Sequence, residues 1–124
     1  MKTCLVVDDS RVIRKVACRI FSDLSYQTAE AENGAEALMA CRRQMPDVIL
    51  LDGHMPLMSG IDFLRSLRSE TKGNHPVVLY CTTENDVAHI SEAMAAGADE
   101  YILKPYDKAL IEDKLAEVGL VQAR

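Results

Sequence analysis

The chain has 124 residues, which is enough for one folded domain with a hydrophobic core and too few for two. Hydrophobic residues make up 48% and charged residues 27%, a balance typical of globular proteins rather than disordered ones. The net charge is −5, so the chain lacks the excess of Lys and Arg that binding to a phosphate backbone needs. No apolar run reaches the roughly 20 residues of a membrane helix. Direct binding to nucleic acid or to a membrane is therefore not expected.

The cysteines do not suggest a disulfide framework or a metal site. Cys4, Cys18, Cys41 and Cys81 form no C-x-x-C pair, and two of them lie in strand-like runs, where cysteine acts as a small buried hydrophobe. The N-terminus passes from "MKT" directly into strand-like residues, without the pattern of a signal peptide. These features predict reduced thiols in a cytoplasmic protein.

Five strand-sized runs alternate with five amphipathic stretches along the chain. In chain order the predicted strands are Cys4–Val7, Tyr26–Glu30, Val48–Leu51, Val77–Cys81 and Tyr101–Leu103. The alternation predicts a parallel sheet with crossover helices. Because the second run, "YQTAE", mixes in polar residues, we expect that strand at an edge of the sheet.

The stretches between the strands carry helix signals. After the first strand, apolar residues recur at helical spacing at Val12, Ile13, Val16, Ala17, Ile20, Phe21 and Leu24. Helix starts are expected at Asn33 with Glu36, at Ser59 with Asp62 and at Asp107, and helix ends at Gly97 and Gly119. Together these signals predict an α/β fold, a flavodoxin-like (βα)5 doubly wound sheet with strand order 2-1-3-4-5, as one domain over residues 1–124.

In such sheets ligands bind beyond the carboxyl ends of the strands. The residues at those ends are Asp8 and Asp9, Asp52, Thr82 and Thr83, and Lys104 and Pro105. Three carboxylates and one lysine sum to −2, and a set of oxygen ligands without a Cys or His cluster favours Mg²⁺, with Mn²⁺ as a substitute. Carboxylates can form aspartyl phosphates, so Asp52 is the candidate nucleophile for a phosphoryl group, and Gly53 would leave a backbone N–H and room for it.

The segments "VVDDS", "VILLDGHMPLMSG", "YCTTE" and "GADEYILKP" each lie at a strand end, and together they resemble the receiver domain of bacterial two-component response regulators. The likeness covers essentially the whole chain and is to the stand-alone, CheY-like chemotaxis type, which implies a single receiver domain with no effector domain. It implies a signalling switch rather than an enzyme. Asp52 would take a phosphoryl group from the phosphohistidine of a sensor histidine kinase, and the modified chain would signal by binding a target protein.

The resemblance also implies a role for each site residue. Mg²⁺ would be bound by Asp9, Asp52 and the backbone carbonyl of His54, with Asp8 acting through water. The phosphoryl oxygens would be contacted by Thr82, Lys104 and the N–H groups of Gly53 and Thr83. The Lys104–Pro105 peptide bond would be cis.

The switch of this family would couple Thr82 to Tyr101. On phosphorylation the Thr82 hydroxyl would move toward the phosphate and Tyr101 would turn inward. Ile90, Tyr101, Leu103 and Lys114 would line an output face on the fourth helix, fifth strand and fifth helix. Unphosphorylated chains would be monomeric, and a phosphatase is a possible further partner. His75 and His89 are expected to be solvated.

Three alternatives stay open at this point. One is a single-domain receiver that acts in a phosphorelay or regulates a kinase outside chemotaxis. Another is an aspartyl-phosphate hydrolase of the haloacid dehalogenase type, although "DDS" lacks the D-x-D spacing of those enzymes. The last is a flavodoxin, although the carboxylates after the first strand would repel the phosphate of FMN.

Overall fold

Strands and helices alternate throughout the part of the chain described by the computed structural model, residues 1–83 and 85–120. The strands are β1 (Thr3–Val7), β2 (Gln27–Ala31), β3 (Val48–Asp52), β4 (Val77–Thr82) and β5 (Glu100–Leu103). The helices are α1 (Arg11–Asp23), α2 (Gly34–Arg43), α3 (Gly60–Ser69), α4 (Val87–Ala96) and α5 (Lys108–Glu117). None of these helices is long and apolar enough to cross a bilayer.

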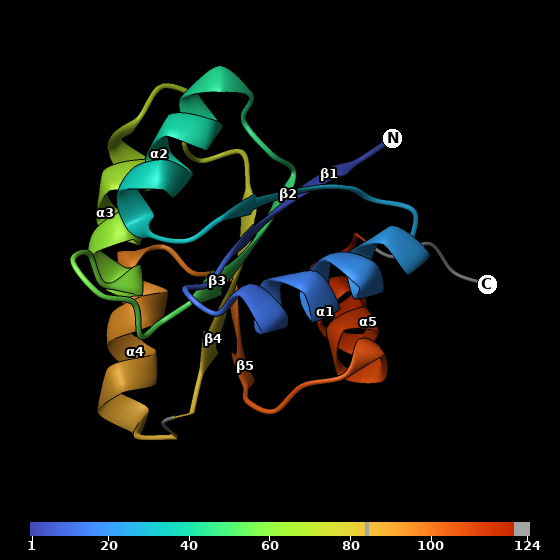
Figure 1. Ribbon diagram of the computed structural model, residues 1–124. Coiled ribbons are helices and arrows are strands. Elements are labelled where there is room, and N and C mark those ends of the chain that lie inside the picture. Colours follow the sequence, from blue (N-terminus) through green and yellow to red (C-terminus); the bar gives the residue numbers. More distant parts are fainter. Residues whose placement is uncertain (84, 121–124) are drawn as a thin grey trace.

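The sheet is entirely parallel, and its strand order is β2-β1-β3-β4-β5. This confirms the predicted topology and places β2 at an edge. Helices α2, α3 and α4 cover one face, and α1 and α5 cover the other (Figure 1). Because all strands run the same way, their carboxyl ends meet along one border of the sheet, which brings together residues that are far apart in sequence.

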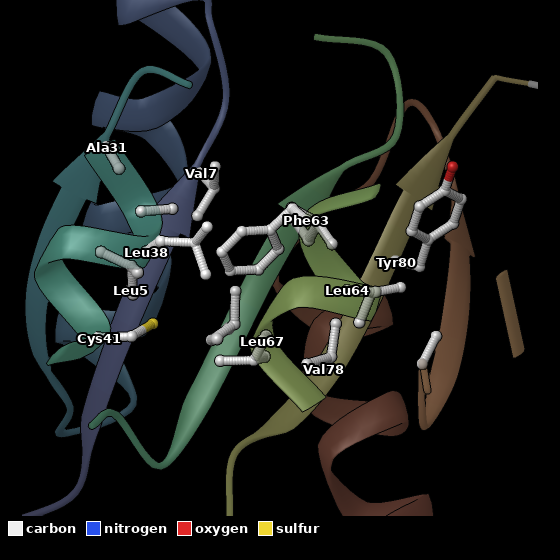
Figure 2. Packing of buried hydrophobic residues seen from close by; sticks show 14 of the residues in the cluster. Leu5, Val7, Ala31, Leu38, Cys41, Phe63, Leu64, Leu67, Val78 and Tyr80 are labelled. Carbon is white, nitrogen blue, oxygen red and sulfur yellow. The ribbon is translucent and has the colours of Figure 1, made fainter. Parts of the chain in front are cut away.

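The sheet separates two hydrophobic cores. Successive strand residues point to opposite faces, so Leu5 and Val7 of β1 join the core under α2, α3 and α4, while Cys4 and Val6 join the core under α1 and α5. Figure 2 shows the first of these cores, in which side chains of α3 such as Phe63 pack against the sheet.

The predicted start of β2 was wrong. Tyr26 precedes the strand, because its N–H donates to the carbonyl of Phe21 at the end of α1 rather than to a neighbouring strand. Its ring is buried edge-on against that of Phe21, with centroids 5.3 Å apart. The remaining strand bounds differ from the prediction by at most one residue at each end.

The predicted helix starts and ends are confirmed, whereas Val12 and Val16 of the predicted apolar face of α1 are exposed. The side chains of Asn33, Ser59 and Asp107 each accept a backbone N–H at the start of a helix. Gly97 and Gly119 follow α4 and α5 with φ of 120° and 79°, conformations that favour glycine. All four cysteines are free thiols.

Candidate functional site

Three carboxylates converge at the carboxyl ends of β1 and β3. These strands are neighbours, with Val7 opposite Leu51, so the chain places Asp8 and Asp52 side by side. Asp8, Asp9 and Asp52 each offer an oxygen, and these oxygens lie within 4.8 Å of one another. Asp8 and Asp52 are buried, whereas Asp9 is exposed. The cluster therefore has a buried floor and an open side.

Lys104 reaches this cluster from the end of β5. Its Nζ donates to Asp52 Oδ1 at 3.1 Å and to Asp8 Oδ2 at 3.3 Å. Burial opposes the charged form of Lys104, but the carboxylates of Asp52 and Asp8 outweigh this effect and raise its pKa. Burial also raises the pKa of Asp8; the N–H of Ser10 opposes this rise and the charge of Asp52 adds to it. One ammonium leaves the three carboxylates in excess, a charge pattern that a divalent cation would balance.

The backbone donors around Asp52 differ from the expectation. The N–H of Gly53, expected to face the phosphoryl group, donates to the carbonyl of Cys81 at 2.8 Å and so continues the β3–β4 ladder. It is the N–H of His54 that donates to Asp52 Oδ1, at 3.1 Å. Without a phosphoryl group, the N–H of Gly53 is therefore engaged by the sheet, because the sheet hydrogen bonds extend one residue past β3.

The side chain of Tyr80 occupies the space where a side chain of residue 53 would lie. A Cβ at this position would lie 2.5 Å from the hydroxyl oxygen of Tyr80, and a Cβ at Gly60 would lie 2.9 Å from the same ring. The two glycines therefore leave room for the buried ring of Tyr80. Figure 2 shows the Tyr80 hydroxyl pointing away from the aliphatic residues of the core.

A polar network beside the carboxylates was missed by sequence reasoning. His54 Nε2 lies 2.9 Å from the hydroxyl of Thr82, which is wholly buried at the end of β4. The rings of His54 and His89 stack with centroids 5.7 Å apart and planes at 11°. His89 Nε2 in turn lies 3.1 Å from the Tyr80 hydroxyl.

This network corrects the expectation that His89 is solvated, because His89 is half-buried. His75 is exposed but bonded, since its Nε2 lies 2.9 Å from Asp47 Oδ1. A signal for the network was present in the sequence: a tyrosine inside an otherwise apolar strand needs a polar partner for its hydroxyl.

The residues of the expected output face lie on adjoining elements. Tyr101 and Leu103 belong to β5, which contacts both α4, with Ile90, and α5, with Lys114. Lys114 Nζ lies 5.3 Å from the centre of the half-buried Tyr101 ring.

Two further residues of the expected site lie at its rim. The Lys104–Pro105 peptide bond is cis. Thr83 is exposed, and with Lys104 and Pro105 it lines a largely apolar hollow of about 230 Å³ beside α1.

Comparisons with known proteins agree with this geometry. The chemotaxis protein CheY-3 of Vibrio cholerae is 35% identical over 115 residues, which cover 92% of this chain and 88% of that protein. The structure of V. cholerae CheY4 matches with a TM-score of 0.90 and 31% identity over 95% of this chain and 98% of that one. The receiver domain of the Pseudomonas aeruginosa sensor histidine kinase PA1611, solved with magnesium in its active site cleft, has the same fold, with a TM-score of 0.85 and 24% identity over 94% of this chain and 95% of that one. The sequence profile of the response regulator receiver domain matches residues 4–116, and the chain belongs to that family.

Proposed function

We propose that this chain is a phosphoryl-accepting switch in which Asp52 takes the phosphoryl group from the phosphohistidine of a sensor histidine kinase. The observation that carries the proposal is the setting of Asp52, a buried carboxylate joined to Lys104 Nζ at 3.1 Å within a cluster of three aspartates. Membership of the receiver family leaves the hydrolase and flavodoxin alternatives without support.

The residues present fit a hard divalent cation. All the candidate ligands are oxygens, their charge exceeds that of Lys104, and exposed Asp9 gives access from solvent. Asp9, Asp52 and the carbonyl of His54 would hold Mg²⁺, with Asp8 acting through water. When bound, the ion would neutralise negative charge on the phosphoryl oxygens.

The hydrogen bonds of Asp52 favour one of its oxygens as the nucleophile. Among the described residues, the hydrogen bonds from Lys104 and His54 both go to Oδ1. Oδ2 would therefore attack phosphorus as the P–N bond of the phosphohistidine breaks and its electron pair leaves with the imidazole. The raised pKa of Lys104 keeps its ammonium charged during transfer, and the N–H of His54 replaces that of Gly53 as the backbone donor beside Asp52.

We further propose that output is protein binding in chemotaxis, because chemotaxis proteins are among the relatives that match most of the chain. The candidate surface comprises Ile90, Tyr101, Leu103 and Lys114, with the Thr82 hydroxyl coupled to Tyr101. A receiver that acts in another relay would share the chemistry at Asp52 and differ in its partner. Binding of the phosphorylated chain to a flagellar switch protein, compared with transfer to a histidine phosphotransfer protein, separates the two.

The acceptor role is tested by intact-mass analysis after incubation with acetyl phosphate and Mg²⁺. We expect one phosphoryl adduct on the wild type, and none on Asp52→Asn or in the presence of a chelator. Asp47→Asn is the matched control, because Asp47 lies at the other end of β3 and should leave the adduct intact. An adduct that survives Asp52→Asn would contradict the proposal.

A further inference from the structure

We propose that His54 is a positioning residue that holds the Thr82 hydroxyl in the unphosphorylated chain, so that phosphorylation must break the His54–Thr82 hydrogen bond and thereby loosen a link to α4. The inference rests on the proposed acceptor role of Asp52. It assigns to the His54 side chain a function separate from that of its backbone carbonyl.

The first step is the position of Thr82. It is the last residue of β4, and its neighbour Cys81 is paired with Asp52 across the sheet. Its carbonyl accepts the N–H of Lys104, so the backbone of Thr82 is fixed between the two strands that carry the acceptor and the lysine. The side chain is 0% exposed, which prevents water from replacing a lost partner of its hydroxyl.

The second step is the support of His54. Although the residue is exposed overall, its ring stacks on His89 of α4 and its Nε2 lies 2.9 Å from Thr82 Oγ1. His89 is held in turn by the Tyr80 hydroxyl at 3.1 Å, and Tyr80 is fixed by close packing against Gly53. The His54 ring therefore lies between the end of β4 and α4, and both contacts define its orientation.

The third step is a competition for one proton. A hydroxyl has a single O–H to donate. In the proposed resting arrangement, Thr82 donates it to Nε2 of the His54 tautomer that carries its proton on Nδ1. A phosphoryl oxygen on Asp52 is a charged and therefore stronger acceptor. Once the proton turns to the phosphoryl group, His54 loses one of its two contacts, and the stack with His89 loosens. Helix α4 thus receives the change through His54 and His89 as well as through Tyr101.

A double-mutant cycle with beryllofluoride, a mimic of the phosphoryl group, tests the competition. With Mg²⁺ present, His54→Ala should bind beryllofluoride about fivefold more tightly than the wild type, the usual net effect of one hydrogen bond. In a Thr82→Val background the same change should alter the affinity by less than about twofold, because no hydroxyl remains to compete for. His75→Ala is the matched control and should leave the affinity unchanged, since His75 bonds Asp47 instead.

The nitrogen chemical shifts of the His54 ring give a second readout. If His54 had only a structural role, these shifts would not change when beryllofluoride binds. In chelator, Nε2 should have the shift of an unprotonated, hydrogen-bonded nitrogen, and Thr82→Val should displace it. Beryllofluoride with Mg²⁺ should displace the wild-type signal in the same direction.

Three results would overturn the inference. One is that His54→Ala binds beryllofluoride more tightly by the same factor in the Thr82→Val background, since His54 would then act by crowding the site. Another is a His54 ring signal that stays unchanged when beryllofluoride binds. If the wild type binds no beryllofluoride at all, the acceptor role of Asp52 fails together with the inference, and this outcome is distinct from the other two.

Discussion

The two ends of the sheet use charged residues in different ways. At the amino end of β4, the guanidinium of Arg68 donates to the carbonyls of Gly97, Gly73 and Pro76 at 2.7 to 3.1 Å, and Nη2 pairs with Asp99 at 3.0 Å. The side chain of Arg68 is only 14% exposed. Arg68 therefore links the loop before β4 to the end of α4 by hydrogen bonds, and its charge has a carboxylate partner.

The carboxyl ends of β1 and β3 have no such balance. Lys104 bonds Asp8 and Asp52, Asp9 adds a third carboxylate, and the pKa of Asp8 is raised mainly because the group is buried. The contrast shows that the presence of charge does not mark a functional site in this fold. A charge that the fold already satisfies is structural, whereas the carboxylates left in excess are where we propose that a cation and a phosphoryl group bind.

The largest effect that tests this contrast is expected at Arg68. Arg68→Ala removes the hydrogen-bond partner of three carbonyls and leaves Asp99 without its cation, so we expect a loss of about 3 kcal/mol in the free energy of unfolding. Urea denaturation measures it. Arg65→Ala is the control, because Arg65 is exposed and its carboxylate contacts are 3.6 Å or longer, and it should change stability by less than about 0.5 kcal/mol. Equal losses in the two variants would contradict the structural role of Arg68.

The next effect tests whether packing also matters at the carboxyl end. Gly53→Ala places a Cβ 2.5 Å from the Tyr80 hydroxyl oxygen, so we expect a loss of about 2 kcal/mol from overpacking, measured by urea denaturation. Because the clash needs both side chains, Tyr80→Leu should relieve part of it, and the two changes together should cost less than the sum of the single ones. Simple additivity would mean that glycine is needed at this position for another reason.

A smaller effect with the opposite sign is expected at Asp8. Because its pKa is raised in the folded chain, its favourable contribution is present at low pH and is lost as pH rises through that pKa. In chelator at pH 7, Asp8→Asn should therefore stabilise the chain, by on the order of 1 kcal/mol, since it removes a like charge beside Asp52. Thermal unfolding across pH checks this prediction. A destabilised variant would show that Lys104 already balances the cluster.

The smallest effect is expected at Asp47, at the amino end of β3. Hydrogen bonds from His75 and from the Thr3 N–H lower the pKa of Asp47. Its stabilising contribution is therefore present above the unfolded pKa near 3.9 and is lost as pH falls through the lowered folded value. In Asp47→Asn, the loss in the free energy of unfolding as pH falls should be smaller than in the wild type by less than about 1 kcal/mol. If the free energy of unfolding falls at low pH in Asp47→Asn as it does in the wild type, the charge of Asp47 has no structural role.

Much of the fold and of the site could be predicted, because both depend on regular features. Apolar runs such as Val48–Leu51 fix the strands, and parallel strands necessarily bring the residues after them to one border. This is why the amino-acid sequence alone was enough to group Asp8, Asp9, Asp52 and Lys104.

The rest depended on contacts that no periodic pattern encodes. Whether Gly53 or His54 turns its N–H toward Asp52 depends on where the β3–β4 ladder ends. The network of Thr82, His54 and His89 depends on the orientation of a histidine in a loop, and Tyr26 leaves the strand because the end of α1 captures its N–H.

The residues of the proposed site lie together at one border of the sheet. This placement also limits the positions at which the genes of two receivers can be recombined. Asp8, Asp9, Thr83 and Lys104 lie within two residues of the end of a strand, whereas the segment 70–76 between α3 and β4 supplies no residue of the proposed chemistry. Chimeras between receivers should therefore tolerate crossovers in the loops that enter the strands. A crossover just after β1 or β5 would separate Asp8 and Asp9, or Lys104, from the strand that positions them, and we expect such a protein to fold without accepting a phosphoryl group.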